Sequence, residues 1–288
     1  NDKLIEFEAK GEIQSVSKIK KSIKNKIHSD FFEVAHIYIE TFKARKKIDR
    51  YKTELRRIEI FREFLGKTRL GFNELDVSTL KRFQTFLLSS EKRSPRTVAN
   101  YLIFMRTIYN FAISEEVADP KFYPFGKGKI QIKIPDTEKI GLNKEELQLL
   151  EQVQNLTETQ EKALDLWLFS FYFAGIRVGD VLKMKWSDFR DGRLYYRMNK
   201  NKKLVSLKIP EKAQIILNKY KNKQLSKTEL IFPYLTKDNL NNELTTATRT
   251  KTITRSLNRR LEMIAEKIGI EKKLSMHIAR HSFGNISG

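Results

Sequence analysis

The sequence predicts a mainly α-helical protein with one small antiparallel sheet, organised as an all-helical N-terminal domain followed by a mixed α+β domain. Three observations support this prediction. Apolar residues recur at helical spacing through most of the chain. Residues 193–199 and 204–209 are rich in β-branched and aromatic residues around a polar turn, which is typical of a hairpin. Residues 119–140 contain three prolines and two glycines without a helical period, which indicates an interdomain linker.

The chain carries a formal net charge of +21, from 56 Lys and Arg against 35 Asp and Glu. Such an excess repels itself unless a polyanion neutralises it, and Lys and Arg bind nucleic acid by releasing its condensed counterions. An anionic membrane is the alternative partner, but the sequence has no basic amphipathic anchor and no apolar run of about 18 residues. We therefore expect a nucleic-acid partner and no membrane association.

A 40% hydrophobic fraction, with 19 Phe, 10 Tyr and 2 Trp, is enough to fill two cores in 288 residues. The lack of cysteine excludes disulfides, thiolate metal sites and cysteine nucleophiles, and it favours a cytoplasmic location. The sequence opens at Asn1 instead of Met and stops at Gly288 within an unfinished helical pattern. We therefore expect a fragment of a longer protein.

Four amphipathic helices are expected in residues 29–118, which predicts a small all-α bundle. Residues 1–28 precede it as a basic lead-in, either solvated or the tail of an upstream domain. The fourth helix has Ser94 as its cap and Pro95 at its first position, the slot that proline favours. Capping residues set the other boundaries, with starts at Ser29 or Asp30 and at Asp76 or Ser78, and a stop near Gly66.

Residues 141–288 combine further helices with the hairpin. Asn143 and Glu146 form a capping-box-like start, and a long apolar helix over residues 157–173 is broken by Gly175. The remaining helices are expected at residues 178–184, from Pro210 to about Tyr220, at residues 248–268 and from near Ser275.

Arg177 follows the apolar helix and lies between Ile176 and Val178. An arginine in such surroundings needs an anionic partner. In a purely structural interpretation Asp180, three residues further on, is that partner and the ion pair fixes the turn. In a functional interpretation the anion comes from a bound molecule.

The hairpin tip carries Lys200, Lys202 and Lys203. A lysine there can enter a groove and reach a phosphate or a leaving oxygen, although a solvated polar turn is the alternative. Farther along, His277 and Arg280 are three residues apart and share one face of a predicted helix.

The spacing of His277 and His281 also suits zinc. A zincin, however, needs Glu where this chain has Ile278, and no third ligand is evident, so we expect no metal. The sequence contains no glycine-rich phosphate cradle, paired-carboxylate site or nucleophile elbow, which disfavours ATP-driven and two-metal enzymes. We expect no cofactor.

Polar residues on the expected outer face of the fourth helix form a further candidate DNA contact. Such a face suits phosphate contacts that position a protein without reading bases, and a plain solvated face is the alternative. The face comprises Arg96, Thr97, Asn100, Tyr101 and Arg106.

The sequence resembles the tyrosine recombinase (phage integrase) family. The resemblance rests on an arginine, a hairpin lysine and a His-x-x-Arg pair in this order, preceded by an all-helical domain that contains Ser-Pro-x-Thr. The resemblance covers nearly the whole chain from about Ser29 and is closest to integrases of Bacteroides-type mobile elements. It implies a four-helix SAM-like core-binding domain at residues 29–118 and a catalytic domain at 141–288, incomplete at its C-terminus. Together they would clamp double-stranded DNA. It further implies a homotetramer on the recombination site, a monomer or weak oligomer when free, a bacterial nucleoid location, and an arm-binding domain upstream of residues 1–28.

The resemblance also implies a role for each site residue. Arg177 and Arg280 match the arginines that stabilise charge on the phosphate during transfer. Lys200 matches the general acid for the leaving 5′ oxygen, although its neighbours Lys202 and Lys203 leave that assignment open. Lys202 is also an expected DNA contact. His277 matches the histidine that assists proton transfer or orients the phosphate.

One departure concerns the nucleophile. The family's third His-or-Trp position and its tyrosine lie on helices beyond Gly288, and none of the ten tyrosines falls in the nucleophile's place. We therefore expect the activating half of a recombinase site, inactive without the missing tyrosine. A non-catalytic DNA-binding regulator with the same clamp is the alternative, and a basic RNA-binding or ribosome-associated protein is a third interpretation.

Overall fold

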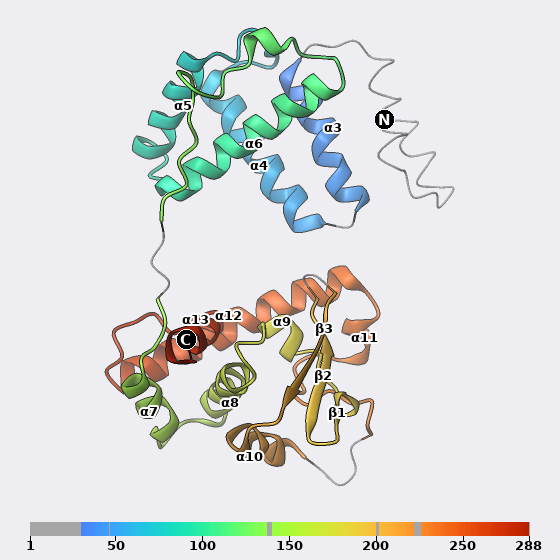
Figure 1. Cartoon of the computed structure of the whole chain (residues 1–288), viewed down its shortest axis with the longest axis vertical. Coiled ribbons are helices and arrows are strands. Elements are labelled where there is room, and N and C mark those ends of the chain that lie inside the picture. Colours follow the sequence, from blue (N-terminus) through green and yellow to red (C-terminus); the bar gives the residue numbers. More distant parts are fainter. Residues whose placement is uncertain (1–29, 46, 137–139, 200–201, 222–225, 288) are drawn as a thin grey trace. The chain divides into compact units, whose positions relative to one another are not determined.

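The structure, a computed structural model, describes residues 30–45, 47–136, 140–199, 202–221 and 226–287 (Figure 1). The lead-in predicted at residues 1–28 and the hairpin lysine Lys200 lie outside the described residues. The chain divides into two compact units, residues 1–137 and 138–288, each with its own core. The described residues are mostly helical with one three-stranded antiparallel sheet, which confirms the predicted fold class.

The first unit contains the four predicted helices, and three of them begin at predicted caps. The side chains of Asp30, Asp76 and Ser94 each accept a hydrogen bond from the backbone N–H three residues ahead. Gly66 ends the second helix in the left-handed conformation, with φ of 61°. The four helices are α3 (Phe31–Ala44), α4 (Ile48–Leu65), α5 (Val77–Ser89) and α6 (Pro95–Ser114).

Aromatic rings fill the core of the first unit. Phe31 makes edge-to-face contacts with Phe61 and Phe72, whose centroids lie 5.8 and 5.7 Å away. Tyr109 on α6 donates a 2.9 Å hydrogen bond to the carbonyl oxygen of Phe72, which ties α6 to the loop between α4 and α5. Figure 1 shows α6 crossing α3 and α4 in this unit.

The stretch predicted as a linker differs from that prediction in its first half. Phe125 and Ile130 are only 5% and 4% exposed and belong to the core of the first unit. They also form a short parallel bridge, which follows a 3-10 turn at Pro120–Phe122. These apolar side chains find a hydrophobic surface on the bundle, so the segment folds back on it instead of leaving the domain at residue 119.

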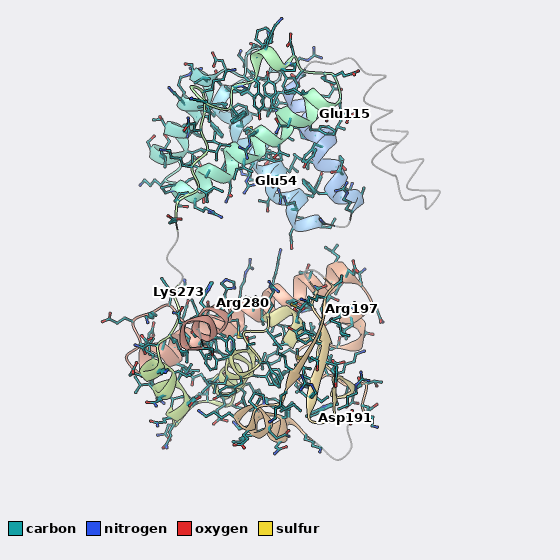
Figure 2. All side chains as sticks on the ribbon, in the orientation of Figure 1. Glu54, Glu115, Asp191, Arg197, Lys273 and Arg280 are labelled. Atoms are coloured by element: carbon teal, nitrogen blue, oxygen red, sulfur yellow. The ribbon has the colours of Figure 1, made fainter. Side chains whose placement is uncertain are left out.

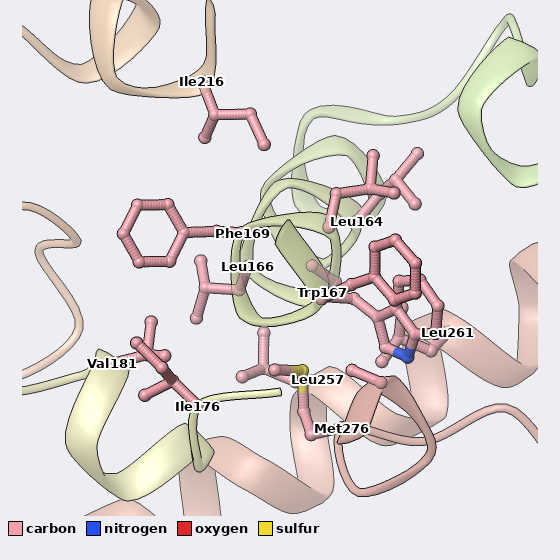
Figure 3. Close-up of a cluster of buried hydrophobic side chains, with 14 of the residues drawn as sticks. Leu164, Leu166, Trp167, Phe169, Ile176, Val181, Ile216, Leu257, Leu261 and Met276 are labelled. Carbon is pink, nitrogen blue, oxygen red and sulfur yellow. The ribbon is translucent and has the colours of Figure 1, made fainter. Parts of the chain in front are cut away.

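The second unit is built around one buried helix, α8 (Glu158–Tyr172). Leu166, Trp167 and Phe169 on α8 are fully buried, because other helices cover the helix on several sides (Figure 3). Its neighbours are α7 (Lys144–Gln152), α10 (Glu211–Tyr220), α12 (Glu243–Lys267) and α13 (Ile278–Ser287).

The predicted hairpin is present as β2 (Arg193–Arg197) and β3 (Leu204–Lys208). A third strand, β1 (Phe189–Arg190), was not expected and pairs with β2. The helix predicted at residues 178–184 is shorter, because α9 spans only Val178–Val181. A short helix, α11 (Lys237–Leu240), was also missed. None of the described helices is long and apolar enough to cross a membrane.

Candidate active site

The turn that carries Arg177 is fixed by the last turn of α8. Ser170 is fully buried, and its hydroxyl donates a 2.6 Å hydrogen bond to the carbonyl oxygen of Ile176. The backbone oxygen of Ser170 also accepts a 2.8 Å hydrogen bond from Gly175 N–H. Ala174 and Gly175 both have positive φ, of 58° and 71°, so the chain reverses sharply. Arg177 is thereby placed, half-buried, at the start of α9.

The first turn of α13 packs directly on this reversal. A Cβ atom on Gly175 would lie 2.6 Å from Cα of Arg280, which is closer than real Cβ contacts come. Nη1 of Arg280 donates a 3.3 Å hydrogen bond to the Gly175 carbonyl oxygen. Figure 2 shows the Arg280 side chain on α13 in the second unit. Only glycine at position 175 lets the two arginine-bearing elements come this close.

His277 lies beside the same arginines. Its pKa is lowered, first by partial burial and then by the positive charges of His281, Arg280 and Arg177. The rings of His277 and His281 meet edge to face at 4.7 Å. A neutral imidazole next to two guanidinium groups can accept or donate one proton while the arginines hold an anion.

The ion pair between Arg177 and Asp180, which the structural interpretation of this turn expects, is not formed: no hydrogen bond or salt bridge joins them among the residues that the structure describes. Asp180 instead accepts a 3.2 Å hydrogen bond from the Asn199 N–H through Oδ1. Burial raises the pKa of Asp180, and the charges of Arg177, Lys183 and Lys202 oppose that rise. Asp180 therefore ties α9 to the base of the hairpin tip.

Part of the hairpin tip is described. Nζ of Lys202 donates to Oδ1 of Asn199 at 3.0 Å, and Arg197 donates to the Lys202 carbonyl oxygen at 2.7 Å. Lys202 and Lys203 are both exposed. Because Lys200 lies outside the described residues, the choice among the hairpin lysines stays a prediction.

The structure also brings Tyr196 to this site, which sequence reasoning missed. Its pKa is raised by burial and by Asp180, and this rise is opposed by Arg280 and Arg177. Tyr196 packs against the core of the second unit from β2. Nothing in its local sequence separates it from any other aromatic residue of a strand.

Most of the predicted DNA face of α6 is accessible, with one correction. Arg96 and Arg106 are exposed, and Thr97 and Asn100 are half-buried. Tyr101 is only 4% exposed and packs edge to face on Phe83, so it does not lie on the outer face. The physical reason is its helical position, which is shared with the buried residues three before and four after it, Val98 and Met105.

Two further features of the second unit concern the binding of DNA and of metal ions. Residues on α12 add exposed positive charge, namely Arg249, Lys251, Arg255 and Arg259. Among the described residues there is no group of three or more His, Cys, Asp or Glu side chains placed to hold a metal ion.

An all-helical domain precedes a mixed domain that contains the Arg177 turn, a basic hairpin and the His277–Arg280 segment, and both domains match family models of phage integrases. The chain belongs to the phage integrase family. Residues 142–286 match the description "Phage integrase family", whose members are tyrosine recombinases, and residues 30–132 match "Phage integrase SAM-like domain".

Solved structures share this fold. A lambda integrase dimer bound to a COC′ core site is 15% identical, with 92% of this chain and 72% of that chain covered and a TM-score of 0.63. A lambda integrase tetramer bound to a Holliday junction is 14% identical, covering 95% and 77%, with a TM-score of 0.62. The Tn1549 transposon integrase with circular intermediate DNA is 13% identical, covering 87% and 85%, with a TM-score of 0.58. No curated protein matches the chain.

Proposed function

We propose that the chain is part of a site-specific recombinase of a mobile element, which cuts and rejoins double-stranded DNA through a 3′-phosphotyrosyl intermediate. One observation carries the proposal: the contact of Gly175 with Arg280 brings together the segments that carry Arg177 and Arg280, and the charges of both arginines lower the pKa of the neighbouring His277. Integrases of similar fold that are bound to core-site, Holliday-junction and circular-intermediate DNA support the choice of substrate.

In the proposed reaction a tyrosine oxygen attacks phosphorus, and the bond from phosphorus to the 5′ oxygen breaks. Arg177 and Arg280 donate hydrogen bonds to the non-bridging oxygens, where negative charge develops. Lys200, or Lys202 in its place, gives a proton to the leaving 5′ oxygen. His277 orients the phosphate or relays the proton lost by the tyrosine. The phosphotyrosyl bond conserves the energy of the broken bond, so rejoining needs no cofactor.

The nucleophile is proposed to lie outside the 288 residues. Tyr196 is the described tyrosine whose pKa responds to both Arg177 and Arg280, but burial raises its pKa and it packs on the core from a strand. A raised pKa and a packed ring disfavour attack on a phosphate.

We further propose that both units contact the DNA. Arg96, Thr97, Asn100 and Arg106 of α6, with Lys202 of the hairpin, are the proposed phosphate contacts. A homotetramer on the recombination site and a monomer or weak oligomer in solution are part of the same proposal, supported by the lambda integrase tetramer of similar fold. A mobile element of Bacteroides-type bacteria and a nucleoid location are the proposed context.

Covalent capture on a nicked suicide substrate tests the reaction in the recombinase that carries its tyrosine. Arg177→Ala and Arg280→Ala are each expected to slow capture by about 100- to 1000-fold. Arg190→Ala is the charge-matched control. Arg190 lies on β1, and its guanidinium carbon is 4.6 Å from the ring centroid of Tyr195 on the paired strand β2. Capture at the normal rate in both arginine variants would overturn the assignment. DNA binding without any capture in the parent protein would support the regulator with the same fold.

A further inference from the structure

Two side chains from different helices hold the turn immediately before His277. The indole Nε1–H of Trp167, on α8, donates a 3.0 Å hydrogen bond to the carbonyl oxygen of Ser275. Oδ1 of Asn258, on α12, accepts a 2.9 Å hydrogen bond from the backbone N–H of Met276. Trp167 lies 108 residues from Ser275 along the chain, so the first of these contacts exists only in the folded unit.

The side chain of Met276 also anchors the turn in the core of the second unit. The Met276 side chain is 3% exposed and belongs to the same buried cluster as Trp167 and Leu257 (Figure 3). The backbone then continues into α13 through short-range bonds, since Ile278 N–H donates to the Ser275 carbonyl oxygen at 3.0 Å. The Ser275 carbonyl oxygen thus accepts two hydrogen bonds, one from the Trp167 indole and one from the Ile278 N–H at the start of α13.

This geometry fixes the direction in which α13 leaves the core. The N–H of Arg280 donates to the His277 carbonyl oxygen at 3.2 Å, so this bond links His277, in the turn before α13, to Arg280 in the first turn of α13. A change in the orientation of the Ser275 carbonyl therefore moves both side chains together. Reacting groups must be held within a few tenths of an ångström, and a misplacement of about 1 Å can cost about 100-fold in rate.

We propose that Trp167 and Asn258 are positioning residues, which hold the turn at Ser275 and Met276 and thereby orient His277 and Arg280 toward the bound phosphate. The proposal rests on the recombinase function proposed above. Neither side chain touches the phosphate in this scheme. Each acts through one backbone group of the turn.

Two variants remove one hydrogen bond each. Trp167→Phe keeps an aromatic ring in the core, deletes the indole donor and also removes part of a fully buried ring, which leaves a small cavity. Trp186→Phe is its matched control, because Nε1 of Trp186 is buried without a hydrogen-bond partner among the described residues. Asn258→Ala deletes the acceptor for Met276 N–H, and Asn258→Asp restores an acceptor oxygen at the same place.

The first readout is structural and needs no catalysis. Amide hydrogen exchange at Met276 in the 288-residue chain is expected to accelerate in Asn258→Ala and to return toward the parent rate in Asn258→Asp. The imidazole signals of His277 and His281 are expected to shift in Trp167→Phe and to stay unchanged in Trp186→Phe. His36, in the other unit, is an internal reference among the four histidines of the chain.

The second readout is the single-turnover rate of covalent capture, measured at saturating DNA. Saturation is needed because the carboxylate of Asn258→Asp could weaken DNA binding, and at saturating DNA weaker binding no longer lowers the rate. Trp167→Phe and Asn258→Ala are expected to slow capture by about 10- to 100-fold with little change in the Kd for DNA. Asn258→Asp should recover most of the rate, and Trp186→Phe should match the parent.

The proposal is overturned if both deletions disturb the turn by the first readout and yet capture proceeds at the parent rate. It is equally overturned if neither deletion changes Met276 exchange or the histidine signals. Failure of the recombinase function itself looks different, because then the parent protein captures no DNA, and Arg177→Ala and Arg280→Ala change nothing.

Discussion

Nη1 of Arg280 lies 3.3 Å from the carbonyl oxygen of Gly175, 105 residues earlier in the chain. The same glycine leaves no room for a side chain, because a Cβ atom would approach Cβ and Cγ of Arg280 to 2.9 Å. Two segments that each carry one arginine are therefore in van der Waals contact through a residue that has no side chain. This contact fixes the spacing of the two backbone segments that carry Arg177 and Arg280.

Gly175→Ala is expected to destabilise the second unit and to slow capture. A left-handed conformation costs an alanine about 1–2 kcal/mol, and the collision with Arg280 adds about 1–3 kcal/mol of strain. Urea unfolding followed by tryptophan fluorescence measures the loss, since both tryptophans, Trp167 and Trp186, lie in this unit. Gly269→Ala is the matched control, with φ of 73° and no atom within 4 Å of the added Cβ. Equal losses in the two variants would show that the contact with Arg280 does not matter.

Asp180→Asn is expected to gain stability relative to the parent as the pH rises. Burial raises the pKa of Asp180, so the folded chain binds the proton more tightly than the unfolded chain, and ionisation above about pH 4 costs stability. Asparagine keeps an oxygen for the Asn199 N–H and cannot ionise. Unfolding at pH 4 and pH 7 measures the difference between variant and parent, which should grow with pH.

The control for Asp180 has the opposite sign. The pKa of Glu158 is lowered by its hydrogen bond and ion pair with Lys162, so its contribution to stability is present at neutral pH and is lost as the pH falls. Glu158→Gln should therefore be less stable than the parent at pH 7 and approach it at low pH. A parallel trend in both variants would contradict the cause assigned to Asp180.

DNA binding is expected to raise the pKa of His277. In the free chain, partial burial and the nearby cations His281, Arg280 and Arg177 hold this pKa below its ordinary value. A phosphate bound between the arginines would offset their charge and favour the protonated imidazole. Titration of the imidazole signals by NMR, with and without a duplex that carries the recombination site, measures the change. An unchanged His277 pKa in a saturated complex would place the phosphate elsewhere.

Arg96→Ala and Arg106→Ala are each expected to reduce the dependence of DNA affinity on salt. Each phosphate contact that is lost lowers the slope of log K against log salt by about 0.9. Arg56→Ala removes the same charge, but Arg56 is paired with Glu59 at 3.3 Å and Glu63 at 3.0 Å, so its slope should match the parent. Tyr101→Phe should leave affinity unchanged, because the ring is buried. Equal slopes in all variants would remove α6 from the DNA face.

The local parts of the fold could be predicted because their causes are local. The caps at Asp30, Asp76, Ser94 and Asn143 depend on residues within three positions, and each is present. The strand β1 was missed because a strand of two residues is too short to show the alternation of apolar and polar residues that indicates a strand. The fold-back of Phe125 could not be read from its neighbours, since its binding surface comes from the distant helices of the bundle.

The sequence by itself determined the fold class, the basic surface and the order in which Arg177, the hairpin lysines, His277 and Arg280 occur along the chain. Helical period, capping and charge are all readable from neighbouring residues. Only the tertiary structure decided that Asp180 binds the hairpin base and not Arg177, that Tyr101 faces the core, and that Gly175 receives Arg280. These contacts join residues whose distance in the sequence says nothing of their distance in space, because packing of the core of each unit brings them together.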